Sequence, residues 1–62
     1  MYIYLVGVAV DHEGDSVQAV LNNAANAIEY ASNIDADCGE RVYVEERVIN
    51  SESVRVIWTS EE

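Results

Sequence analysis

Two short polar segments hold most of the side chains that could do chemistry. In "NIDADCGE", residues 33 to 40, oxygen-bearing side chains stand at alternate positions: Asn33, Asp35 and Asp37. That spacing is typical of a calcium loop, but the required glycine comes one residue late, at Gly39. Val44 occupies the position of the bidentate glutamate. The pattern therefore predicts a solvated loop and no metal site.

The second segment, "DHEGD" at residues 11 to 15, contains His12, and Cys38 lies in the first. We expect a helix of about 18 residues between them, which at ~1.5 Å per residue keeps them roughly 27 Å apart. A Cys-His pair within one chain is then excluded, and no glycine-rich phosphate loop or serine nucleophile motif is present. The sequence predicts a chain that is not an enzyme and has no cofactor.

Acidic residues dominate the charge. Twelve Asp and Glu face three Arg and no Lys, for a net charge of −9. Such a chain is repelled by nucleic acid and anionic membranes and attracted to basic protein surfaces. We therefore expect a protein partner with a basic surface, no direct nucleic acid and no membrane. Solubility or adaptation to a salt-rich cell is the alternative reason for the acidity.

Hydrophobic periodicity indicates the elements that position these residues. The apolar opening, residues 2 to 10, is too short to span a membrane and reads as a strand of a cytoplasmic protein. Asp15 and Gln18 fit a capping box, which predicts a helix over residues 16 to 33. Residues 41 to 49 and 53 to 59 read as further strands. The expected fold is α+β, β-α-β-β, in a single domain over residues 1–62, with one helix on a three-stranded mixed or antiparallel sheet. The strand order stays open.

The expected helix has one apolar face and one neutral face rich in amides. The apolar face, which we expect to pack on the sheet, holds Val17, Val20, Leu21, Ala24, Ile28 and Ala31. The neutral face is unusual in so acidic a chain and predicts a partner-binding stripe of Asn22, Asn26, Tyr30 and Asn33. The acidic loops compete for that role through Asp11, Glu13, Asp15, Asp35 and Asp37. An exposed helix of unoptimised residues is the third interpretation.

One helix cannot cover both faces of a sheet. We expect Val42, Val44, Val48, Val54, Val56 and Trp58 to meet the helix, with Gly7 and Ala9 beneath it and Val6 and Val8 outward. Glu46 is out of place on the inner face and indicates a bulge or an edge strand. The uncovered face then predicts an interface of a possible homodimer, formed edge to edge or face to face. Its residues are Tyr2, Tyr4, Arg41, Tyr43, Arg47, Arg55 and Ile57.

In size, absence of lysine and clustered acids ("DHEGD", "DADCGE", "VEE", "SEE"), the chain resembles small phage-encoded inhibitors of CRISPR or restriction systems. Several of those proteins are DNA mimics. The resemblance implies a non-catalytic, anti-CRISPR-like protein that occupies a basic nucleic-acid-binding surface of a host defence protein in the host cytoplasm. It is one of composition, so no functional residues carry over. The alternatives are a small structural or assembly subunit that oligomerises through its open sheet face, and a salt-adapted domain.

Overall fold

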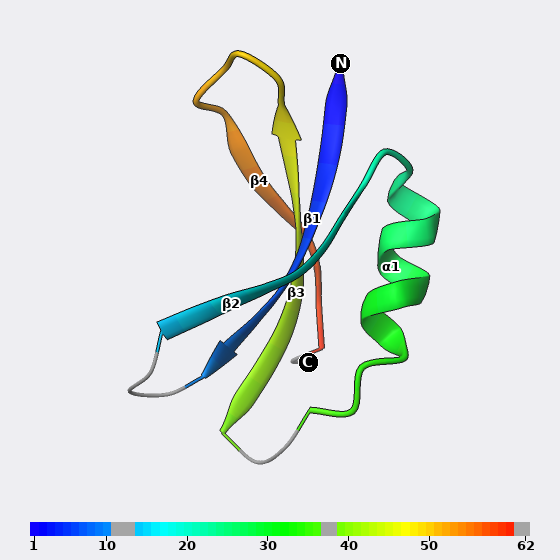
Figure 1. The fold of residues 1–62 in the computed structure, drawn as a ribbon, viewed down its shortest axis with the longest axis vertical. Helices are drawn as coiled ribbons and strands as arrows, with labels where there is room; N and C mark the ends of the chain where they lie inside the picture. Colours follow the sequence, from blue (N-terminus) through cyan, green and yellow to red (C-terminus); the bar gives the residue numbers. More distant parts are fainter. Residues whose placement is uncertain (11–13, 37–38, 61–62) are drawn as a thin grey trace.

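The computed structural model describes residues 1–10, 14–36 and 39–60. Its elements are β1 (Tyr2–Val10), β2 (Gly14–Leu21), α1 (Ala24–Ser32), β3 (Glu40–Val48) and β4 (Val54–Thr59). The sheet has four strands in the order β2-β1-β3-β4, and every neighbouring pair is antiparallel (Figure 1). The predicted three-stranded β-α-β-β arrangement is therefore wrong: a second strand precedes the helix.

The missed strand is β2, which was assigned to the first half of the helix. Val17 and Val20 are three residues apart, a spacing that indicates a helix face. In the sheet, Val6 pairs with Ala19 and Gly7 with Val17, so Gln18 is an extra residue on β2. This bulge brings Val17 and Val20 to the same side of the strand. A bulged strand thus imitates the spacing of a helix.

The helix begins after Asn23, which has extended backbone angles and accepts the backbone N–H of Asn26 on its Oδ1 at 3.0 Å. Asn23 is therefore the N-cap, and the predicted capping box at Asp15 and Gln18 is wrong. Residues 24 to 32 are helical as predicted. The helix contacts β1, β2 and β3 on one side of the sheet through the buried Ala27 and Ala31. Their small side chains allow α1 to lie close to the strands.

The core lies between α1 and the central strands. Val6 pairs with Val44 and Val8 with Val42. All four valines are buried beneath the helix, and Tyr2 and Tyr4 point to the same side. The prediction that Gly7 and Ala9 lie under the helix was wrong. Gly7 instead pairs with Tyr43 on the opposite face, where a side chain on Gly7 would overlap the Tyr43 ring.

A second bulge changes the faces of β4. Val44 pairs with Trp58 and Glu45 with Val56, so Ile57 is the extra residue. Trp58 faces the helix side as predicted, but Val54 and Val56 face away from it. An irregularity was predicted near Glu46. The bulge is instead at Ile57 of β4, opposite Val44 and Glu45 of β3. Glu46 is not at an edge, because β3 lies between β1 and β4.

Candidate protein-binding surface

The acidic segments do not form a metal site in the described part of the chain, where no three His, Cys, Asp or Glu side chains come together. Asp35 is exposed after the helix, and Asp15 accepts a hydrogen bond from the Tyr43 hydroxyl at 3.1 Å. Asp11, His12, Glu13, Asp37 and Cys38 lie outside the described residues. The helix between the two loops has nine residues rather than about 18. No helix among the described residues is long and apolar enough to cross a membrane.

The residues of the predicted dimer interface do not share one face. Pairing between strands places Arg41, Tyr43 and Arg47 on the face opposite the helix. Tyr2, Tyr4 and Arg55 lie on the helix side. Ile57, at the β4 bulge, packs against the core. The open face therefore holds only part of the predicted set.

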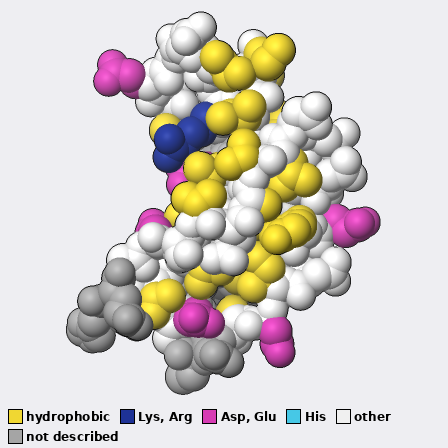
Figure 2. All heavy atoms as spheres, in the orientation of Figure 1, with side chains coloured by type: hydrophobic (Ala, Val, Ile, Leu, Met, Phe, Trp, Pro, Cys, Tyr) yellow, Lys and Arg dark blue, Asp and Glu magenta, His cyan; other side chains and the backbone are white. Residues whose placement is uncertain are grey.

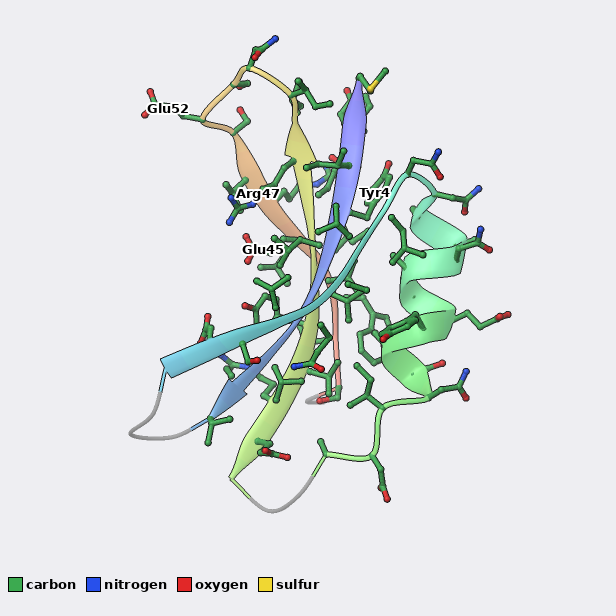
Figure 3. All side chains as sticks on the ribbon, viewed as in Figure 1. Tyr4, Glu45, Arg47 and Glu52 are labelled. Atoms are coloured by element: carbon green, nitrogen blue, oxygen red, sulfur yellow. The ribbon has the colours of Figure 1, made fainter. Side chains whose placement is uncertain are left out.

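That open face forms a hollow of about 500 Å³. Figure 2 shows the outline of the molecule hollowed on the side opposite the helix, and in Figure 3 Glu45 and Arg47 point to that side. Arg47 Nη2 lies 3.2 Å from Glu45 Oε2. Burial, and then the hydrogen bond to Asp15, raises the pKa of Tyr43. The residues that line the hollow thus carry charges of both signs, and the Tyr43 hydroxyl donates a hydrogen bond to Asp15.

A polar cluster on the helix side uses another arginine. The Tyr4 hydroxyl donates to Glu46 Oε2 at 3.4 Å, and Arg55 Nη2 lies 3.3 Å from Glu46 Oε1. Burial, and then the charge of Glu46, raises the pKa of Tyr4. The cluster gives partners to a carboxylate that stands in a central strand, where an unpaired charge would be unfavourable. Its role is structural.

The amide stripe of α1 borders a groove of about 520 Å³ between the helix and the end of β2. The groove is lined by Asn26, Tyr30 and Asn33, with Leu21, Ile34 and the acidic Glu29. Asn33 Nδ2 donates to the backbone oxygen of Glu29 at 3.0 Å. The side-chain amide of Asn26 and the Tyr30 hydroxyl make no hydrogen bond within the described residues, although the backbone N–H of Asn26 donates to Asn23. Tyr30 is 45% exposed. The stripe therefore offers an aromatic ring and free amide groups; Asn22, in the turn before the helix, is also exposed.

The stripe continues onto β2. From residue 16 to residue 28 the chain has no charged side chain, although its net charge is −9. Val17 and Val20 are 58% and 57% exposed on this edge strand. In Figure 2 hydrophobic and uncharged side chains cover the middle of the face over β2 and α1, and charged ones lie around it. We call β2 residues 16–21 together with Asn26, Tyr30 and Asn33 the edge surface.

No protein-family model, curated protein or solved structure matches this chain. The resemblance to phage-encoded inhibitors therefore still depends on size and charge. The sequence pattern predicts the helical half of the edge surface, but its prediction that Val17 and Val20 pack in the core is wrong, because both are exposed on β2. The signal that could have located them is the absence of charge over residues 16 to 28, which extends well beyond one face of a helix.

Proposed function

We propose that this chain is a non-catalytic protein-binding module that binds through the edge surface. The observation that carries the proposal is an edge strand that has no charge from residue 16 to residue 21 and two exposed valines, in a chain of net charge −9. Edge strands present unpaired backbone groups, and proteins usually protect them with charge. An uncharged, apolar edge is suited to contact with another polypeptide.

Tyr30 is the proposed anchor of this surface. A tyrosine buries a large ring on binding while its hydroxyl forms a hydrogen bond, which makes it a frequent hot-spot residue. Its neighbours in the groove, Asn26 and Asn33, add amide groups. The acidic residues around the edge surface affect the rate of association more than the final affinity, because exposed charges act at long range.

A second candidate is an acidic inhibitor that occupies a basic nucleic-acid-binding surface of a host defence protein. The ion pairs favour it. Arg47 and Arg55 each lie beside a glutamate, so their charge is largely neutralised. Glu29, Asp35 and Glu52 are exposed, and the surrounding field stays negative. In this account the partner is basic, and screening by salt releases it.

Capture experiments with tagged protein in a bacterial lysate distinguish the two candidates. We compare the unmodified chain, Tyr30→Ala, and a variant combining Asp11→Asn with Glu13→Gln, at low and high salt. If the edge surface binds, Tyr30→Ala weakens binding of the captured protein by more than about 1 kcal/mol. The neutralised variant then mainly slows association.

Tyr2→Ala is the matched control, because Tyr2 is 53% exposed but lies outside the edge surface. It should leave capture unchanged. If the neutralised variant loses the captured protein at low salt and Tyr30→Ala keeps it, the protein works through its charge and the first proposal is wrong.

A further inference from the structure

We propose that the edge surface is covered by a second copy of this chain, with the two β2 strands paired antiparallel about a two-fold axis between Gln18 and Ala19. This inference rests on the proposed function, because it names the occupant of the same surface. Pairing of the two β2 strands would join the two four-stranded sheets into one continuous sheet, with both helices on the same side of it.

The two edges of the sheet differ in how they are protected. At one edge, β4 carries Arg55 in its sequence and follows Glu52 in the preceding turn. At the other edge, β2 has no charged residue after Asp15. A long, apolar, unguarded edge is a site for pairing with another strand. The pairing is therefore expected at β2 and not at β4.

The bulge at Gln18 restricts the register, and the axis between Gln18 and Ala19 keeps Asp15 out of the paired segment. It places Val17 and Val20 on one face of β2, while Ala19 and Leu21 point to the helix side. An axis between Gln18 and Ala19 sets Val17 opposite Val20 of the partner copy. The same axis sets Ser16 opposite Leu21 of the partner copy. Each pair then has both side chains on one face, as antiparallel pairing requires.

Charge favours a second copy at this position. Two chains of net charge −9 repel each other, and the repulsion falls only where the facing surfaces lack charge. Residues 16–21 of β2 meet that condition, and Glu29 is the one charged residue that lines the adjoining groove. The hollow on the opposite face instead brings together Asp15, Arg41 and Glu45. The axis also turns the stripe of Asn26 and Tyr30 towards the same stripe of the partner copy. An acidic stripe at this position would face the same acidic stripe of the partner copy and repel it. Neutral amide side chains avoid that repulsion.

Light scattering after size-exclusion chromatography of the full chain tests the proposal. The chain has a mass of 6.9 kDa, and we expect about twice that mass at micromolar concentration. Val20→Lys should weaken the dimer about tenfold or more, because it places a charge in the paired edge. Val56→Lys is the matched control: Val56 is a valine of 54% exposure on the other edge strand. Both changes alter the net charge equally.

Circular dichroism confirms that each variant is folded before its mass is interpreted. A folded unmodified chain of 6.9 kDa throughout the concentration range overturns the proposal. So does a dimer that Val56→Lys dissociates and Val20→Lys leaves intact. The proposed function is tested separately. If the chain is a monomer and Tyr30→Ala abolishes capture of another protein, the proposed protein-binding function stands and only the pairing with a second copy is wrong.

Discussion

At the scale of single residues, the contact between Gly7 and Tyr43 explains which side chains of β1 face the helix. The two residues are direct neighbours on β1 and β3, and the Tyr43 ring lies against the α-carbon of Gly7. Any side chain at position 7 would occupy the space of the ring. The alternation along β1 follows, because placing Gly7 opposite Tyr43 turns Val6 and Val8 towards the helix.

Gly7→Ala should destabilise the protein by about 1–3 kcal/mol, the usual cost of overpacking. A Cβ at this position would lie 2.9 Å from Cε2 of Tyr43 and closer still to Cζ and the hydroxyl. In an ordinary strand the same change would favour folding by about 0.5–1 kcal/mol, since glycine loses more entropy. The sign of the measured effect therefore separates the two cases. Urea unfolding monitored by circular dichroism measures it.

A double-mutant cycle supplies the control. In a Tyr43→Ala background the ring is absent, and adding Gly7→Ala should cost much less or become favourable. If Gly7→Ala is equally destabilising in both backgrounds, the ring is not the reason for the glycine.

At the scale of elements, sequence patterns located three of the four strands and the second half of the helix. Strands expected at residues 2–10, 41–49 and 53–59 correspond to β1, β3 and β4 within about one residue, the usual uncertainty of such boundaries. These segments are rich in β-branched residues. β2 escaped because the Gln18 bulge gives it a helical spacing, and a second bulge at Ile57 reversed the expected faces of Val54 and Val56. Bulges depend on pairing with a neighbour, so local patterns do not reveal them.

The helix boundary provides a test at this scale. Asn23→Ala should lower the free energy of unfolding by about 1 kcal/mol, because it removes the acceptor of the Asn26 N–H. Asn22→Ala is the matched control, since Asn22 is also an exposed asparagine and makes no hydrogen bond within the described residues. Chemical denaturation of both variants gives the comparison. Equal losses for the two would show that Asn23 does not cap α1.

For the whole molecule, coverage of the sheet decides which surfaces are open. The helix of nine residues is about 14 Å long, whereas β1, also of nine residues, extends about 30 Å. Within residues 1–10, 14–36 and 39–60 the opposite face has no helix, and β2 and β4 are both edges. The uncovered face was predictable from the sequence, because one helix cannot cover both faces of a sheet. The neutral stripe was predictable from the helical spacing of its residues. The place where the two surfaces meet, along β2, was not predictable, because residues 16–21 have the spacing of a helix and not of a strand.

Amide hydrogen exchange of the full chain at low and high protein concentration tests the binding role of the β2 edge most directly. Pairing between copies protects backbone N–H groups that are otherwise exposed at an edge. We predict that exchange in β2, around Val17 and Val20, slows as concentration rises, while exchange in β4, around Val54 and Val56, stays constant. Slowing confined to β4, or no change in either edge strand across a range in which the mass doubles, would contradict the account.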